Sequence, residues 1–147
     1  GKRYFEYPSK YYCMDLGLRN ARLNFRQQEE SHIMENVIYN ELVSRGYGVD
    51  VGVVKINETD NDGKRHQNNC EIDFVINRGM KRYYIQSALT LPDETKTRQE
   101  RRPLLSVKDM FRKVIITKTT ARPWLDEDGI LRLGIYDFLL DDKVLDL

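Results

Sequence analysis

The clearest periodic segment of the chain runs from about Gln28 to Arg45 and has the spacing of an amphipathic helix. Gly46 follows it directly, at a position where helices favour a residue in the left-handed conformation. Arg45 places a positive charge at the negative end of the helix dipole. The pattern therefore predicts a helix that ends at Gly46. Its apolar stripe consists of Ile33, Met34, Val37, Ile38 and Leu42.

Alternation of apolar and polar residues predicts a β-hairpin in the middle of the chain. Within residues 71–76 every second side chain shares a face, because successive side chains of a strand point to opposite sides. The turn around Gly79 then leads into a partner strand over residues 82–89, which Pro92 ends. The first strand places Ile72, Phe74 and Ile76 on one face and Glu71, Asp73 and Val75 on the other; the second groups Tyr84, Gln86 and Ala88.

Other runs predict further strands. Residues 47–56 are rich in valine, and residues 113–117 have the continuous apolar character of a fully buried central strand. Residues 57–69 are polar, which predicts either a surface loop or a frayed hairpin. Tyr11–Met14 is expected to form a short strand that ends in a turn at Asp15–Gly17, and Tyr4–Tyr7 is also strand-like.

The second half of the chain adds one more helix and a closing segment. Residues 97–109 form a basic segment with helical spacing, although Pro103 obscures where that helix would start. Residues 130–140 return to the core after an acidic loop. Helices and strands alternate without an internal repeat or a low-complexity linker, which favours one layered α/β domain over residues 1–147. Because the chain opens on a strand-like run without an initiator Met, we expect it to belong to a longer protein.

Composition excludes several classes of function. Lys and Arg number 24 against 23 Asp and Glu, so the net charge of +1 gives no overall attraction to nucleic acid or anionic lipid. No apolar run approaches the roughly 20 residues that span a bilayer, so no membrane partner is expected. Cys13 and Cys70 lack the spacing of a zinc site or a disulfide framework. We expect a cytoplasmic protein with reduced thiols and surface residues at His32 and His66.

Three polar side chains are expected to meet at one edge of the sheet. Glu35 lies at the border of the helical stripe, and the predicted hairpin brings Asp73 close to Gln86. Oxygen ligands of this kind suit a hard cation such as Mg²⁺, with Asp73 and Glu35 as its candidate ligands. The alternative is structural: hydrogen-bonded carboxylates, a salt bridge to Arg82, an amide that bridges backbone groups, and a solvated Glu71.

Six short stretches carry a resemblance to a known family: Lys10–Leu18, Met34–Leu42, Glu71–Val75, Tyr84–Gln86, Arg112–Thr117 and Asp128–Ile130. Their order and spacing resemble the restriction-endonuclease-like fold, named for its PD-(D/E)XK motif. They are more closely similar to the domain of unknown function that follows the ATPase module in many AAA-family ATPases of prokaryotes. The resemblance extends from about Tyr11 to Leu140 and implies a central mixed sheet flanked by helices.

The resemblance also implies roles for individual residues. It places the helix carboxylate of the fold on Glu35, the metal-binding aspartate on Asp73, the second acidic ligand on Gln86 and the catalytic lysine on Ala88. A neutral amide and a methyl group thus replace the anion and the cation that metal binding and phosphate attack require. The implied catalytic set is vestigial or weak. Lys81 and Lys113 are the nearby candidates for a migrated base.

A basic cluster stands apart from these residues and consists of Lys96, Arg98, Arg101 and Arg102. It predicts either a phosphate-binding groove or a solvated helix face interleaved with Glu94, Glu100 and Asp109, and the second interpretation is favoured. The glycines fit neither a P-loop nor a dinucleotide fingerprint, so the chain itself is not expected to bind ATP.

Three functions follow as hypotheses. The first is a non-catalytic accessory domain that mediates partner, substrate or subunit contacts for an attached ATPase and holds no cofactor. The second is a Mg²⁺-dependent nuclease that acts on DNA through Glu35, Asp73 and Gln86, and the third is a DNA-binding module that uses the basic cluster. The expected partner is an upstream ATPase module of the same chain, with DNA and a second copy of the chain as further candidates.

Overall fold

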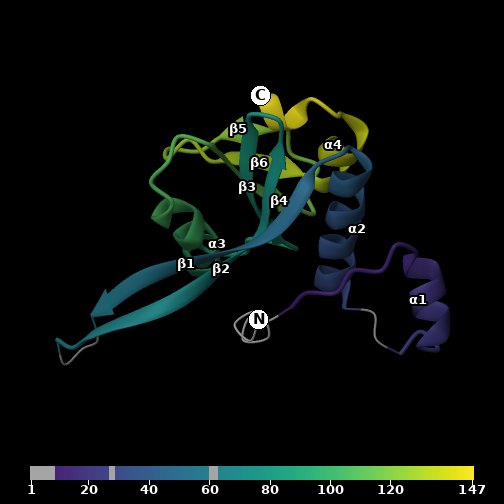
Figure 1. The fold of residues 1–147 in the computed structure, drawn as a ribbon, viewed down its shortest axis with the longest axis horizontal. Helices are drawn as coiled ribbons and strands as arrows, with labels where there is room; N and C mark the ends of the chain where they lie inside the picture. The colour runs from purple at the N-terminus through teal and green to yellow at the C-terminus, as the bar shows by residue number, and fades with distance from the viewer. Residues whose placement is uncertain (1–8, 27–28, 60–62) are drawn as a thin grey trace.

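The computed structural model describes residues 9–26, 29–59 and 63–147, which form one six-stranded mixed sheet with helices on both faces (Figure 1). The strands are β1 (Gly48–Thr59), β2 (Arg65–Arg78), β3 (Lys81–Ala88), β4 (Arg112–Thr117), β5 (Trp124–Leu125) and β6 (Leu131–Gly134). The helices are α1 (Leu16–Arg22), α2 (Glu30–Ser44), α3 (Glu94–Ser106) and α4 (Ile135–Leu140), followed by the 3-10 turn η2 (Val144–Asp146).

The sheet changes from antiparallel to parallel at β3. β1, β2 and β3 are antiparallel neighbours, whereas β3, β4 and β6 run parallel to one another. The short β5 pairs antiparallel with β6 at the far edge, which gives the order β1-β2-β3-β4-β6-β5. The prediction of a mixed sheet flanked by helices is therefore confirmed.

The two faces of the sheet bury separate hydrophobic clusters. α2 and α4 cover the face that carries Phe74, Ile85 and Val114, and α3 covers the face that carries Tyr84 and Ile115. Residues 114–116 are all 0% exposed, as expected of a central strand. The long apolar run of β4 thus has a simple cause, because helices cover both of its faces.

α2 forms as the periodicity predicts. Met34, Ile38 and Leu42 are buried on the sheet, and Gly46 follows the helix with φ of +79°. The backbone N–H of Tyr47 returns to the carbonyl of Leu42, which closes the end of the helix. The predicted stop at Gly46 is confirmed.

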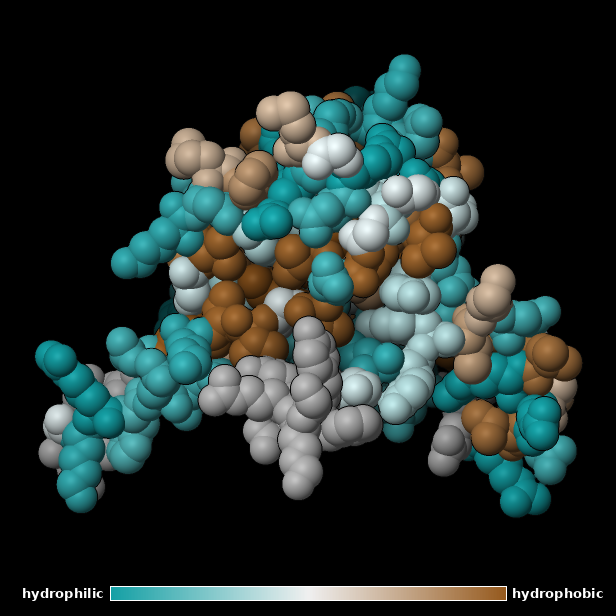
Figure 2. Space-filling model, in the orientation of Figure 1, coloured by the Kyte–Doolittle hydropathy of each residue, from teal (hydrophilic) through white to brown (hydrophobic). Residues whose placement is uncertain are grey.

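β1 and β2 form a hairpin that is paired from Gly48 opposite Asn77 to Thr59 opposite Arg65. The polar stretch 57–69 therefore belongs mainly to two paired strands, so the hairpin alternative is right and the surface-loop alternative is wrong. The outer part of this hairpin projects from the body as an arm (Figure 1), and its surface is hydrophilic (Figure 2). Residues 65–69 of this arm are all exposed, which agrees with its polar composition.

An extra residue in β2 changes which side chains share a face. Asp50 pairs with Val75 but Gly52 pairs with Ile72, so β2 contains a β-bulge at residues 73–74. A Cβ atom on Gly52 would lie 2.7 Å from Val75 and 3.0 Å from Ile72, so these two side chains flank Gly52 on one face. Ile72 packs with the α3 cluster, while Phe74 packs with the α2 cluster. The prediction that Ile72 and Phe74 share a face is therefore wrong.

The N-terminal segment, residues 10–14, is not a strand of the sheet. Its backbone hydrogen bonds go to side chains of α2 instead, and the expected strand at Tyr11–Met14 is wrong for that reason. The expected turn at Asp15–Gly17 is the start of α1, where the Asp15 carboxylate caps the helix by accepting from the N–H of Leu18. The strand-like run Tyr4–Tyr7 lies outside the described residues.

α3 begins and ends three residues earlier than the basic pattern predicts. Asp93 accepts from the backbone N–H of Lys96 and so fixes the start of the helix. Pro103 lies inside the helix rather than at its start and is buried with Leu104. The segment 130–140 returns to the core as β6 and α4, as expected.

The remaining surface features are few. α1 has no buried residue. Leu18 within this helix and Phe25 shortly after it are both exposed. Figure 2 shows brown, hydrophobic patches in this part of the surface. Cys13 and Cys70 are free thiols, and His32 and His66 are exposed, as the sequence predicts. Among the helices of the described ranges, none is long and apolar enough to cross a membrane.

Candidate functional site

One lysine ammonium lies at the centre of three carboxylates. Lys10 Nζ is 2.9 Å from Glu35 Oε1, 2.8 Å from Asp73 Oδ1 and 2.5 Å from Glu71 Oε1. We call these three acids, Glu35 on α2 and Glu71 and Asp73 on β2, the carboxylate cluster. The sequence pattern placed Glu35 and Asp73 near one another, and the structure joins them through a residue from the N-terminal segment.

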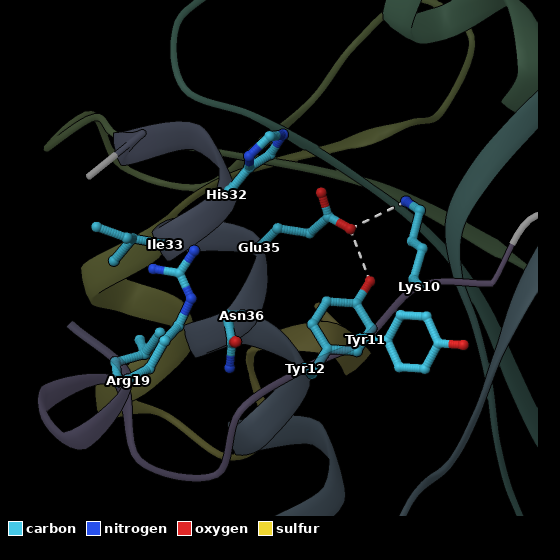
Figure 3. Close-up of a pocket in the computed structure, with 9 residues that line it drawn as sticks. Lys10, Tyr11, Tyr12, Arg19, His32, Ile33, Glu35 and Asn36 are labelled. Atoms are coloured by element: carbon cyan, nitrogen blue, oxygen red, sulfur yellow. Dashed lines mark hydrogen bonds and ion pairs between the residues drawn. The ribbon is translucent and has the colours of Figure 1, made fainter. Parts of the chain in front are cut away.

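Aromatic packing holds this segment against α2. The Tyr12 ring stacks on Tyr39 with 4.1 Å between centroids, and its hydroxyl donates to Glu35 Oε1 at 2.6 Å. Figure 3 shows the Lys10 ammonium and the Tyr12 hydroxyl converging on the Glu35 carboxylate beside a pocket of about 250 Å³. Glu35 therefore has two donors, both from the N-terminal segment.

Asn36 fixes the same segment through its backbone. The Asn36 amide accepts from the N–H of Cys13 at 2.9 Å and donates to the Cys13 carbonyl at 2.8 Å. Asn40 adds donations to the carbonyls of Cys13 and Met14. A buried side-chain amide can satisfy one donor and one acceptor of a backbone unit, as a neighbouring strand would. This explains why the segment lies extended without belonging to the sheet.

Asp73 is held in place by the end of β3. Its second carboxylate oxygen, Oδ2, accepts from the backbone N–H of Ser87 at 2.8 Å. The backbone N–H of Asp73 donates in turn to the side-chain oxygen of Gln86 at 2.8 Å. Both bonds lie just beyond Phe74 and Ile85, the last pair of the β2–β3 ladder, at the bulge. Side chains thus replace the ladder where the two strands separate.

Gln86 adjoins the carboxylate cluster without joining it. Its amide nitrogen donates to Glu100 of α3 at 3.1 Å, on the opposite side of the sheet from α2. The amide therefore bridges the β2 backbone and α3. This is the bridging arrangement expected of a structural glutamine, because an amide can both donate and accept.

The charges in the site are unevenly matched. Burial lowers the pKa of Lys10, but hydrogen bonds and attraction from Asp73 and Glu71 outweigh it and raise that pKa above its ordinary value. Burial raises the pKa of Asp73, and the Lys10 ammonium and the Ser87 N–H offset only part of that rise. Burial and the bond to Glu35 also raise the pKa of Tyr12. Lys10 is therefore firmly protonated, while the cluster around it holds excess negative charge.

The site has limited capacity for a metal while Lys10 is in place. Within residues 9–26, 29–59 and 63–147, no three His, Cys, Asp or Glu side chains have the arrangement of a metal site as they stand, and this includes the carboxylate cluster around Lys10. The oxygens of the carboxylate cluster that bind Lys10 Nζ are those that a hard cation would need. A divalent ion would therefore have to displace the ammonium.

Other residues proposed from the sequence lie elsewhere. Lys81 pairs with Asp146, and Lys113 donates to the carbonyls of Asp109 and Phe111, so neither lysine contacts the carboxylate cluster. Arg82 donates to Asn77 rather than to Asp73. Glu71, expected to be solvated, is half-exposed and bound to Lys10. Sequence reasoning missed Lys10, although it begins the first stretch that carries the family resemblance.

The basic cluster on α3 is largely paired with acids. Lys96 pairs with Glu100 at 2.6 Å and Arg98 with Glu94 at 3.2 Å. Arg101 pairs with the acidic loop that follows β5, through Asp126, Glu127 and Asp128. Arg102 also has a partner. These pairs favour the solvated helix face over a phosphate-binding groove. Asp109 is not interleaved with the cluster, because it accepts from the Tyr84 hydroxyl at 2.6 Å.

Comparison with known proteins gives one informative match. The chain is 32% identical over 140 residues to an uncharacterized protein of Haemophilus influenzae. That match covers 95% of this chain but 31% of the other protein, so the chain spans about a third of the length of this curated relative. No protein-family model matches the chain. No solved structure matches it.

Proposed function

We propose that this chain is a nuclease-like accessory domain without catalysis of its own, which contributes partner, substrate or subunit contacts to an attached AAA-family ATPase. The observation that carries this proposal is the position of Lys10, whose ammonium is bound by all three acids of the carboxylate cluster. An internal cation there neutralises charge that a catalytic metal would otherwise neutralise.

The order of elements supports the restriction-endonuclease-like assignment. A helix, three antiparallel strands, a second helix and a parallel strand follow one another from α2 to β4. The departures from the family pattern at Gln86 and Ala88 support the absence of catalysis. Gln86 is engaged with the backbone of Asp73 and with Glu100, and Ala88 is buried at 4% exposure.

The association with an ATPase rests on the resemblance. The Haemophilus influenzae relative, of which this chain matches 31%, is long enough to contain a further module. In the full-length protein, Asp73→Ala should leave ATP hydrolysis and the contacts of this domain unchanged, provided the domain stays folded. A loss of either would contradict a merely structural role for Asp73.

A metal-dependent nuclease is the second candidate, and Lys10 is the observation in its favour. Its ammonium lies 2.8 Å from Asp73 and so supplies a cation that the family pattern places at residue 88. In this alternative Lys10 would stabilise charge on the attacked phosphate after the metal takes its place among the carboxylates. The two candidates therefore differ in whether Lys10 blocks the site or serves it.

A cleavage assay separates these candidates. DNA and RNA are incubated with Mg²⁺ or Mn²⁺ and the wild-type protein, Asp73→Asn or Lys10→Ala. We expect no cleavage by any of the three, because loss of single electrostatic contacts of this kind costs about 100- to 1000-fold in rate. Metal-dependent cleavage that disappears in Asp73→Asn would establish the nuclease instead.

Metal binding provides a readout besides activity. Thermal unfolding is measured with and without Mn²⁺ for the wild-type protein and for Lys10→Met. A cation that binds the folded state raises the unfolding temperature. We expect no rise for the wild-type protein and a rise for Lys10→Met, because only the variant leaves the carboxylates without their cation. A rise for the wild-type protein would show that Lys10 does not block the site.

The DNA-binding alternative through the basic cluster is less favoured, since Lys96, Arg98 and Arg101 are paired with acids. If it holds, affinity for duplex DNA should fall steeply with salt and should weaken in Arg98→Gln. We expect no such binding at moderate ionic strength.

A further inference from the structure

A second pocket, of about 520 Å³, lies outside the carboxyl ends of the parallel strands β3, β4 and β6. It is separate from the carboxylate cluster and the basic cluster. Crevices at the carboxyl ends of parallel strands are common ligand sites in α/β proteins, and this volume is within the usual range for small ligands. Its position and volume therefore suit a small ligand.

The charge of this pocket is one-sided. Lys118, Arg122 and Arg132 line it, and no acid of the described residues belongs to the lining. Two of these cations are paired with acids outside the lining, Lys118 with Glu30 and Arg132 with Asp126. The whole chain is nearly balanced, with 24 basic and 23 acidic residues, so the pocket departs from the average surface. Thr117 and Thr119 add hydroxyl groups at the end of β4. Several cations with neighbouring hydroxyls suit an anionic oxygen group such as phosphate.

Both arginines of the lining have unused hydrogen-bonding capacity. Arg132 has a side chain 10% exposed and is fixed through Nε to Asp126 at 3.1 Å. Its Nη1 is buried and finds no acceptor among the described residues. A buried donor without an acceptor is unfavourable, and native proteins seldom leave one. Arg122 is exposed and forms no ion pair with an acid in the described part of the chain.

Another part of the pocket wall is aromatic and suits a planar ring of a ligand. Trp124, the single tryptophan of the chain, lines the pocket and is 54% exposed. An exposed indole beside cationic groups can stack with a nucleobase, which contributes about 1–3 kcal/mol per base in single-strand binding proteins. The pocket is thus cationic and hydroxyl-rich at one part of its wall and aromatic at another.

We infer that this pocket binds a nucleoside phosphate unit, with the phosphate at Arg122 and Lys118 and the base against Trp124. The unit can be a free nucleotide or the 5′-phosphorylated end of a single strand, because both present the same groups. Arg132 forms the fixed cationic floor. Lys118 is also paired with Glu30 of α2, so it is already oriented from one side. This site requires no metal and does not depend on the nuclease-like assignment.

Trp124 itself reports on the proposal through its fluorescence. The protein is titrated, without divalent metal, with AMP, with inorganic phosphate and with a short 5′-phosphorylated single strand. We expect saturable quenching by AMP or by the oligonucleotide, weakened by added salt. Phosphate alone should compete with them without causing the same quenching. Quenching by AMP but not by the strand identifies the free nucleotide as the source, and quenching by the strand at lower concentration identifies its terminus.

Matched variants decide whether the pocket is responsible. Arg122→Gln removes an exposed charge in the pocket, and Arg98→Gln removes an exposed charge on α3 outside it. We expect binding to weaken about tenfold or more in the first and to stay unchanged in the second, because hydrogen bonds to charged groups contribute about 1.5–3 kcal/mol. Calorimetric binding to Trp124→Leu should weaken as well. Absence of quenching by every probe, or equal loss in the two arginine variants, would overturn the inference.

Discussion

The side-chain oxygen of Gln86 accepts the backbone N–H of Asp73 at 2.8 Å, at the position where the β2–β3 ladder would otherwise continue. The same amide donates to Glu100 at 3.1 Å. Gln86 is 6% exposed, so both bonds form away from bulk water. One side chain therefore ties the bulged strand to the helix on the far face of the sheet.

Gln86→Glu should destabilise the fold. A carboxylate can still accept from Asp73 but cannot donate to Glu100, and two like charges would then lie in contact. We expect the free energy of unfolding to fall by about 2 kcal/mol at neutral pH, with partial recovery in mild acid. Urea denaturation measures this, with Gln99→Glu on the exposed face of α3 as the matched control. Equal stability of the two variants would show that the amide donation is unimportant.

Asn36→Ala should detach the N-terminal segment from α2. The variant leaves the N–H of Cys13 without its acceptor and removes one of the two donors to the Cys13 carbonyl, the other being Asn40. We expect a loss of about 2 kcal/mol in the free energy of unfolding. Asn40→Ala is the control, because it has the same change in helix propensity but removes only exposed donations. Its loss should stay below about 1 kcal/mol. Similar losses from both variants would mean that the burial of Asn36 does not matter.

Lys10→Met and Glu71→Gln should lower the free energy of unfolding by different amounts, although both break the ion pair between Lys10 and Glu71. Removal of the ammonium leaves two largely buried carboxylates unpaired, and we expect a loss of about 3 kcal/mol. Glu71→Gln removes one of three acids that share a single cation, so the free energy should change by less than about 1 kcal/mol. Denaturant titration at pH 7 measures both. A double variant, Lys10→Met with Asp73→Asn, should be more stable than Lys10→Met alone, and no recovery would argue against excess negative charge.

Asp146 should give the fold a stability contribution limited to a window of pH. The pKa of its carboxyl is lowered by hydrogen bonds from Lys81 and Tyr83, so its contribution is present above the ordinary carboxyl pKa and is lost as pH falls through the lowered value. The pKa of Tyr83 is raised by burial and by its bond to Asp146. The contribution of the Tyr83 hydroxyl to stability is present below the ordinary tyrosine pKa of roughly 10, and it is lost as pH rises through the raised value.

The difference in stability between the wild-type protein and Asp146→Asn should therefore be largest near neutral pH and shrink at both extremes. Its size should stay below about 1 kcal/mol, because Lys81 and Asp146 are both substantially exposed. Thermal unfolding across a pH series provides the measurement. A difference that is constant with pH would contradict the role of the ionised carboxylate.

The periodicity of apolar residues was sufficient to predict the elements whose faces are buried in a regular pattern. The stripe of α2, the hairpin of β2 and β3 and the uniform apolar run of β4 each follow from one pattern of burial. The bulge in β2 was not predictable, because an extra residue in an alternating run leaves no mark in the residues themselves. Gly52 is the one local signal, and it acquires meaning only when its partner strand is known.

The sequence allowed the acids of the candidate site to be predicted, but not the lysine that binds them. Glu35 and Asp73 lie on elements whose faces follow from sequence, but Lys10 lies on a segment fixed by side chains. The nearest carboxylate that it binds is 25 residues away in the chain. No propensity rule describes a strand-like stretch whose backbone partners are the amides of Asn36 and Asn40.

The attachment of the N-terminal segment has a consequence for dynamics. Its bonds join residues 23 to 63 positions apart, and none of them is part of the sheet ladder. Contacts of this kind can be lost without global unfolding. We therefore expect the segment to open locally while the sheet stays folded. Such an opening would withdraw Lys10 and expose the carboxylates, so the accessibility of the cluster would be set by a local equilibrium within the folded protein.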